Sequence, residues 1–158
     1  MQEQINILVG TMTGTAELVA DDVKAELEAG GFAVDILPMD NLDATVFERT
    51  GLFLICTSTY GQGDVPDNAR AFFEDLQARR PDLAGIRFGV IGLGDSTYAD
   101  TYCNGGRQFD DLLQALGARR IGDRLDHNAS GTSLPEVAAV EWVRRWSELL
   151  SPLAMAAE

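Results

Sequence analysis

Val9-Gly10-Thr11-Met12-Thr13-Gly14-Thr15-Ala16-Glu17 joins an apolar run to an amphipathic helical pattern. Residues 5–9 are largely apolar and rich in β-branched side chains, which is typical of a strand buried on both faces. After this stretch, apolar residues recur at helical spacing from Ala16 to Leu27, and Gly30 and Gly31 provide a stop. The sequence therefore predicts a strand, a turn and a helix in succession.

The turn has the features of a phosphate site. The N–H groups in the first turn of a helix have no acceptor within the helix, and the positive end of the helix dipole favours an anion. The hydroxyls of Thr11, Thr13 and Thr15 and the amides from Met12 to Ala16 can together bind one terminal phosphate. An ordinary helix cap is the alternative interpretation, because Thr and Gly are favoured there too. Glu17 would repel a phosphate, so we expect its side chain to face solvent.

The same residues argue against two other kinds of phosphate site. The stretch lacks the lysine of the G-x-x-x-x-G-K-[ST] motif that binds nucleoside triphosphates. It also fails the G-x-G-x-x-G pattern of dinucleotide sites. A single terminal phosphate is the ligand that remains.

The composition indicates one globular domain over residues 1–158, because 46% of the residues are hydrophobic and no linker is evident. The sequence has neither a signal peptide nor an apolar run of about 20 residues, so we expect a cytoplasmic protein. The net charge of −13 disfavours nucleic acid and membranes as partners and favours proteins with basic surfaces. Cys56 and Cys103 lie far apart, which predicts reduced thiols and no metal site.

Strand and helix patterns alternate along the rest of the chain. Residues 52–56 and 88–92 are continuously apolar and predict interior strands, whereas 32–37 and 119–126 alternate and predict edge strands. Apolar residues at helical spacing predict three further helices; they are Ala69, Phe72, Phe73 and Leu76, then Phe109, Leu112, Leu113 and Leu116, then Ala139, Trp142, Val143, Trp146, Leu149 and Leu150. We interpret Cys56, Trp142 and Trp146 as packing residues.

This alternation predicts an α/β fold with a doubly wound, five-stranded parallel sheet of order 2-1-3-4-5 and helices on both faces. That order has one switch point, between the first and third strands, and ligands bind there beyond the carboxyl ends of the strands. Three polar stretches, residues 10–17, 57–68 and 93–104, each follow one of the interior strands. We therefore expect them to converge on one crevice.

Two of these loops carry a tyrosine beside small residues: Tyr60 precedes Gly61, and Tyr98 follows Gly94. Two aromatic side chains from separate loops can enclose a flat ring, although tyrosines in loops also serve as half-buried fillers. A flat ring next to a phosphate site describes a mononucleotide such as FMN.

The sequence resembles flavodoxins, in particular the short, MioC-like members and the FMN domains of diflavin reductases. The motifs that carry the resemblance are residues 10–17, residues 58–68 and Gly92-Leu93-Gly94-Asp95-Ser96-Thr97-Tyr98. It implies noncovalent FMN, with the phosphate on Thr11 to Ala16 and the isoalloxazine ring between Tyr60 and Tyr98.

The third loop departs from the family pattern, because Tyr98 is followed by Ala99-Asp100-Thr101-Tyr102-Cys103. Tyr102 is therefore an alternative to Tyr98 as the main stacking residue, although we favour Tyr98. The resemblance also implies contacts from residues after the second and third interior strands and at the end of the last strand. The expected cofactor-binding residues are Thr11, Met12, Thr13, Gly14, Thr15, Ala16, Ser58, Thr59, Tyr60, Gly61, Gly63, Leu93, Gly94, Asp95, Tyr98, Tyr102, Cys103 and Asp126.

Bound flavin performs the redox chemistry itself, so we expect no catalytic side chain. The leading hypothesis is a monomeric carrier of single electrons between a separate NAD(P)H-dependent reductase and acceptor enzymes with basic docking faces. An FMN-dependent NAD(P)H:quinone reductase and a flavin-binding regulatory module are the alternatives.

Overall fold

A parallel sheet forms the centre of the computed structural model, which describes residues 4–10, 15–49, 51–58, 67–94, 104–128 and 135–157. Its strands are β1 (Gln4–Gly10), β2 (Ala33–Pro38), β3 (Leu52–Ser58), β4 (Arg87–Gly94), β5 (Arg119–Arg120) and β6 (Leu125–Asn128). The order is β2-β1-β3-β4-β5, and β6 also pairs with β4. Every pairing between these strands is parallel. The predicted order is confirmed.

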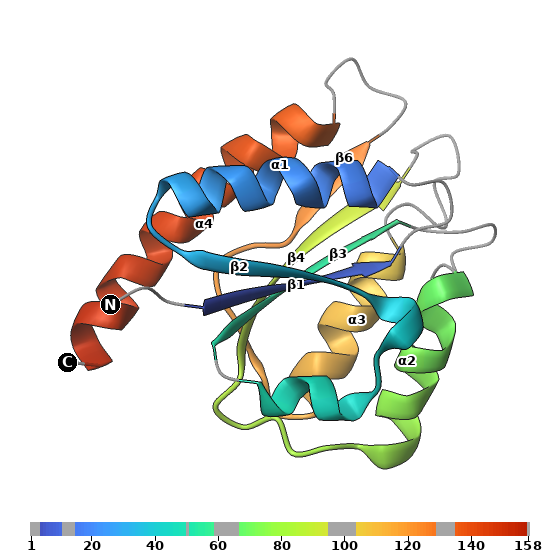
Figure 1. Cartoon of the computed structure of the whole chain (residues 1–158). Helices are drawn as coiled ribbons and strands as arrows, with labels where there is room; N and C mark the ends of the chain where they lie inside the picture. Colours follow the sequence, from blue (N-terminus) through green and yellow to red (C-terminus); the bar gives the residue numbers. More distant parts are fainter. Residues whose placement is uncertain are drawn as a thin grey trace.

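Helices cover both faces of the sheet (Figure 1). α1 (Thr15–Ala29) and α4 (Pro135–Ala157) lie on one face, and α2 (Asp67–Arg79) and α3 (Asn104–Ala115) lie on the other. Two short 3-10 helices, η1 (Met39–Asn41) and η2 (Ala44–Glu48), connect β2 to β3. None of these helices combines the length and the apolar character needed to cross a membrane.

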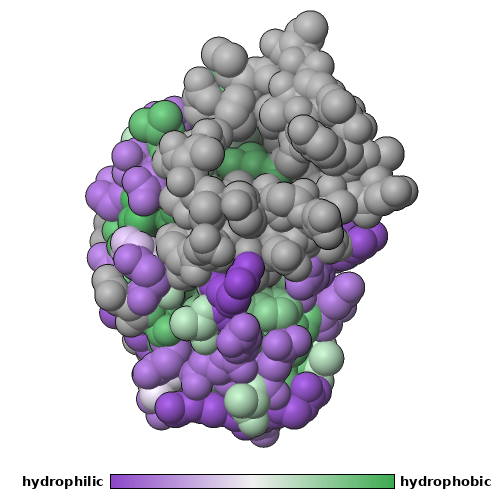
Figure 2. Space-filling view, turned by 90° about the vertical axis from the view of Figure 1, so that its right-hand side faces the viewer, coloured by the Kyte–Doolittle hydropathy of each residue, from purple (hydrophilic) through white to green (hydrophobic). Residues whose placement is uncertain are grey.

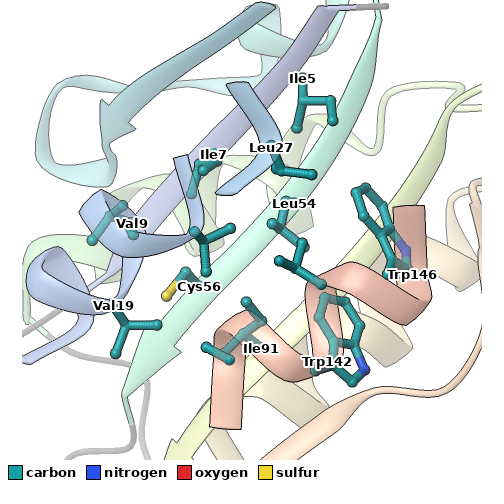
Figure 3. Close-up of a cluster of buried hydrophobic side chains, with 14 of the residues drawn as sticks. Ile5, Ile7, Val9, Val19, Leu27, Leu54, Cys56, Ile91, Trp142 and Trp146 are labelled. Carbon is teal, nitrogen blue, oxygen red and sulfur yellow. The ribbon is translucent and has the colours of Figure 1, made fainter. Parts of the chain in front are cut away.

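The interior strands are continuously apolar because each supplies side chains to two cores. Ile7 of β1 and Leu54 of β3 belong to the core under α1 and α4, whereas Leu8 and Phe53 belong to the core under α2 and α3. Successive side chains of a strand point to opposite faces, so a strand covered on both sides needs apolar residues at every position. Figure 3 shows the first of these cores, in which labelled residues of β1 and β3 lie with Val19 and Leu27 of α1 and with Trp142 and Trp146 of α4.

Trp142 and Trp146 are stacked on each other in this core, with ring centroids 5.7 Å apart and planes 16° apart. They are 9% and 1% exposed. A Cβ on Gly89 of β4 would lie only 2.7 Å from Nε1 of Trp146, so the missing side chain makes room for the indole. The interpretation of both tryptophans as packing residues is confirmed.

The last strand is less regular than predicted. The expectation of one strand over residues 119–126 is wrong, because β5 and β6 are separated by residues 121–124 and β6 continues to Asn128. Gly122 has a φ of +68°, a conformation that turns the chain out of the extended path. The Nε of Arg120 donates to the carbonyl of Gly122 over 3.0 Å, which closes this bend.

Leu149 was expected on the buried face of the last helix, but its side chain is 48% exposed. The residue facing it is Gly122: a Cβ there would lie 2.7 Å from Cδ1 of Leu149. Because the bend offers no side chain to pack against, Leu149 covers the glycine and leaves half of its surface in solvent.

Candidate functional site

The carboxyl ends of the central strands meet at one edge of the sheet. The register pairs Gly10 with Thr57, Ser58 with Leu93, and Gly94 with Asn128. The helix after β1 lies on one face of the sheet, and the helix after β3 lies on the other. The switch point is therefore between β1 and β3, where ligands of doubly wound sheets bind. Figure 2 looks onto this edge, and the described surface in its lower half is largely hydrophilic.

Small residues bring the start of α1 close to this switch point. A Cβ on Gly10 would lie 2.8 Å from Oγ1 of Thr57 and 3.0 Å from Sδ of Met39, so the strand end has no space for a side chain. Ala16, in the first turn of α1, is fully buried, and its carbonyl accepts a hydrogen bond from Sγ of Cys56 at 3.5 Å. The N-terminus of a 15-residue helix is thereby held against β3.

This arrangement fits the phosphate of FMN. The helix supplies no acceptors for its first-turn N–H groups, and the positive end of its dipole lies at the switch point. Thr15 is the first residue of α1, so its amide and that of Ala16 belong to this turn. Glu17 is exposed, as expected, which keeps its carboxylate on the solvent side.

Four other predicted site residues lie on neighbouring strands at the same edge. Ser58 and Leu93 are register partners at the ends of β3 and β4, and Gly94 is the last residue of β4. Asp126 of β6 pairs with Gly92 of β4. The topology thus brings these residues together with Thr15 and Ala16 at one end of the sheet.

The remaining predicted site residues lie outside the described residues. The two tyrosine loops are among them, so the enclosure of a flat ring stays a prediction. These residues are Thr11, Met12, Thr13, Gly14, Thr59, Tyr60, Gly61, Gly63, Asp95, Tyr98, Tyr102 and Cys103.

Asp126 is held by an arginine that the sequence analysis missed. The guanidinium of Arg124 donates to both carboxylate oxygens of Asp126, over 2.8 and 3.2 Å. The same guanidinium donates to Asp110 of α3 over 2.9 Å. The hydrogen bond with Asp126 is the main cause that raises the pKa of Arg124. Arg124 and Asp126 would share a face of the strand predicted over residues 119–126, so their spacing was a signal for the contact, although Arg124 lies just before β6.

Cys56 is inert in this setting. Its side chain is fully buried, and burial raises the pKa of its thiol to about 12. The expectation that it fills the core is confirmed. Among the residues that the structure describes, no group of three or more His, Cys, Asp and Glu side chains is arranged to hold a metal ion.

The strand order and the helix terminus at the switch point are those of a doubly wound α/β protein, a class of which flavodoxin is itself a standard example. The family model described as flavodoxin matches residues 7–142. The chain therefore belongs to the flavodoxin family, whose members bind FMN and transfer electrons.

Several relatives show the same family at considerable identity. Flavodoxin YqcA of Escherichia coli is 40% identical over 148 residues, which cover 94% of this chain and 99% of that protein. MioC of Escherichia coli is 37% identical over 92% of this chain and 97% of its own length. The sulfite reductase [NADPH] flavoprotein alpha-component of Bacillus subtilis is 38% identical over 80% of this chain, but only 21% of that protein is matched.

A solved structure agrees with the fold. An alanine variant of flavodoxin from Pseudomonas aeruginosa superposes with a TM-score of 0.84 at 37% identity, covering 94% of this chain and 99% of that one. The predicted resemblance to flavodoxins and the predicted fold class are confirmed.

Proposed function

We propose that this protein is a cytoplasmic, monomeric, single-domain carrier that takes single electrons from a separate NAD(P)H-dependent reductase and passes them to acceptor enzymes. The observation that carries the proposal is the N-terminus of α1 at the β1/β3 switch point of a flavodoxin-family sheet. FMN supplies the electron chemistry when it is bound, and the protein sets its potential through contacts and nearby charge.

The residues of the chain have separate tasks in this proposal. The start of α1 binds the phosphate through its amides and the hydroxyl of Thr15. Ser58, Leu93 and Gly94 border the cofactor at the ends of β3 and β4. Tyr60 and Tyr98 cover the two faces of the flavin ring and exclude water from it, with Tyr102 as the alternative to Tyr98.

A separate reductase is supported by one relative. The Bacillus subtilis protein has NADPH in its name, and the segment similar to this chain makes up only a fifth of it. We infer that this chain does the task of that segment and that a nicotinamide-dependent reductase supplies its electrons.

The surface near the start of α1 suits a partner with a basic face and an apolar centre. Leu18 is 66% exposed, and Glu17, Asp21 and Asp22 around it on α1 are exposed as well. An apolar side chain within a charged rim is the usual anatomy of an interface, and the negative charge steers a positively charged partner.

A binding comparison tests the cofactor part of the proposal. Apoprotein is titrated with FMN and, separately, with riboflavin, and the quenching of flavin fluorescence is recorded. We expect one FMN per chain, bound at least tenfold more tightly than riboflavin, because only FMN carries the phosphate for α1. Equal affinities would contradict the phosphate site.

A kinetic comparison tests the role as a carrier. FMN-loaded protein is mixed with NADPH and a quinone, with and without an added flavodoxin reductase. We expect electron flow only when the reductase is present. Steady turnover without it would support the quinone reductase instead, and failure of reductases to reduce the protein would support a regulatory module.

A further inference from the structure

Four charged side chains connect α3 to the last strand of the sheet. Asp110 of α3 is 1% exposed and accepts from Arg120 of β5 and from Arg124, which precedes β6. Arg124 also holds Asp126 through two hydrogen bonds. The side chains of Arg124 and Asp126 are 19% and 32% exposed, so their pairing is only partly screened by water.

Asp126 lies at a crowded junction of three elements. A Cβ on Gly92 of β4 would lie 3.2 Å from Oδ1 of Asp126 and 3.6 Å from Cα of Gly106. Gly106 belongs to the first turns of α3 and is even closer to Gly92, since a Cβ there would lie 3.0 Å from Cα of Gly92. The carboxylate of Asp126 therefore sits beside the place where α3 packs on β4, two residues before the carboxyl end of β4.

We propose that Arg124 is a positioning residue of the cofactor site, which holds the carboxylate of Asp126 at the carboxyl edge and compensates its negative charge. The inference rests on the proposed function, because it assumes that FMN binds at this edge.

The hydrogen bonds show that Arg124 does more than anchor α3. Asp110 has two other partners, Arg120 and Nε2 of Gln114, the latter at 2.7 Å. Arg124 itself donates two hydrogen bonds to Asp126 and one to Asp110. Arg124 thus brings a positive charge to Asp126 through two hydrogen bonds, whereas Asp110 also has Arg120 as a cation.

Electrostatics determines the direction in which loss of Arg124 shifts the potential of the bound flavin. Fully reduced flavin carries one negative charge at neutral pH, whereas the oxidised ring is neutral. A carboxylate without its cation disfavours the reduced form, and the effect is larger where water is partly excluded. Loss of Arg124 should therefore make the potential of the bound flavin more negative.

The test uses FMN-loaded Arg124→Gln, whose flavin potential is measured against reference dyes under anaerobic conditions. We expect a shift to more negative values, and we expect Asp126→Asn in the same chain to return the potential toward that of the wild type. Arg124→Lys keeps the charge and should stay close to the wild type.

Arg120→Gln is the matched control, because it removes the other cation from Asp110 and leaves Arg124 to pair with Asp126. We expect it to lower the melting temperature with a smaller shift of the potential. An unchanged potential in Arg124→Gln, an equal shift in Arg120→Gln, or no return with Asp126→Asn would overturn the proposal. Wild-type protein that fails to bind FMN would instead overturn the proposed function.

Discussion

Thr15 is the residue at which helix stability and phosphate binding make opposite demands. It is the first residue of α1, where a negative side chain stabilises a helix by roughly 0.3–1 kcal/mol through the helix dipole. The same charge would repel the phosphate of FMN.

We therefore predict that Thr15→Asp leaves the melting temperature of the apoprotein unchanged or raises it, while it weakens FMN binding by at least tenfold. Thr15→Asn is the matched control, since it has the same shape without the charge and should retain most of the affinity. Titration of flavin fluorescence measures the affinity of both variants for FMN. If the Asp variant bound FMN as tightly as the Asn variant, α1 would not hold the phosphate.

The buried thiol of Cys56 makes the stability of the protein depend on pH in the alkaline range. The pKa of this thiol is about 12 in the folded protein, whereas in an unfolded chain it ionises near its ordinary pKa of 9.0. Between these values the unfolded chain binds fewer protons than the native protein, so the stabilising effect of the raised pKa is complete below pH 9 and is lost as the pH rises to 12.

The free energy of unfolding should accordingly fall by up to about 1.4 kcal/mol per pH unit through this thiol alone. Cys56→Ala removes the effect, so the advantage of the wild type, about 1 kcal/mol at pH 7, should shrink above pH 9 and reverse its sign at about pH 10. Urea unfolding at a series of pH values checks this. A constant difference from pH 7 to pH 11 would show that the thiol ionises equally in both states.

At the scale of single elements, the end of α1 is set by two adjacent glycines with different conformations. Gly31 has a φ of +96°, and the N–H of Phe32 donates to the carbonyl of Leu27 over 3.1 Å, which closes the helix. Gly30 has no positive φ and lies within the helical hydrogen bonding, as its N–H donates to Glu26 and Leu27.

We predict that Gly31→Ala destabilises the protein by about 1–2 kcal/mol, the cost of a left-handed conformation for a residue with a Cβ. No atom lies within 4 Å of the new methyl, so the cost is purely conformational. Gly30→Ala should be neutral or stabilise by up to about 1 kcal/mol. Thermal unfolding compares the two, and equal effects would contradict the assignment of the helix end to Gly31.

The sequence predicted best those helices and strands whose residue pattern has one dominant physical cause. β1, β3 and β4 are apolar at nearly every position because both faces are buried, and Gly31 and Gly117 mark helix ends by a positive φ. The last strand was harder to predict because residues 121–124 leave the sheet at Gly122, and an alternating pattern does not reveal such a bend. Leu149 was mispredicted for the same reason.

The site was predictable only in part. Glycine and threonine after a buried strand pointed to the helix terminus, and the structure places Thr15, Ala16, Ser58, Leu93 and Gly94 at one edge. The buried Asp110 had no signal in the sequence, because an aspartate in a helix usually belongs to a solvated face. Its role depends on Arg120 and Arg124, which come near it only in the folded chain.

For the whole molecule, the net charge of −13 governs encounters with partners. Long-range attraction is screened by salt, since the Debye length falls from about 30 Å at 0.01 M to about 8 Å at 0.15 M. We predict that the association rate with a flavodoxin reductase falls steeply over this range.

Substitutions of two exposed glutamates of α1 distinguish steering by charges near the cofactor site from steering by the net charge of the protein. Glu17 lies at the end of α1 near the proposed cofactor site, and Glu28 lies near the other end. Stopped-flow measurements should show a larger loss of association rate at low salt for Glu17→Gln than for Glu28→Gln. Equal losses would assign the steering to net charge alone.

The number of electrons that the bound flavin takes up in each step distinguishes a carrier of single electrons from a two-electron enzyme. The absorption spectrum of FMN-loaded protein is recorded during anaerobic stepwise reduction, with free FMN as the reference. We predict that one-electron-reduced flavin accumulates on the protein well above its level in free FMN before full reduction. A direct passage from the oxidised to the fully reduced spectrum would contradict the proposed role as an electron carrier.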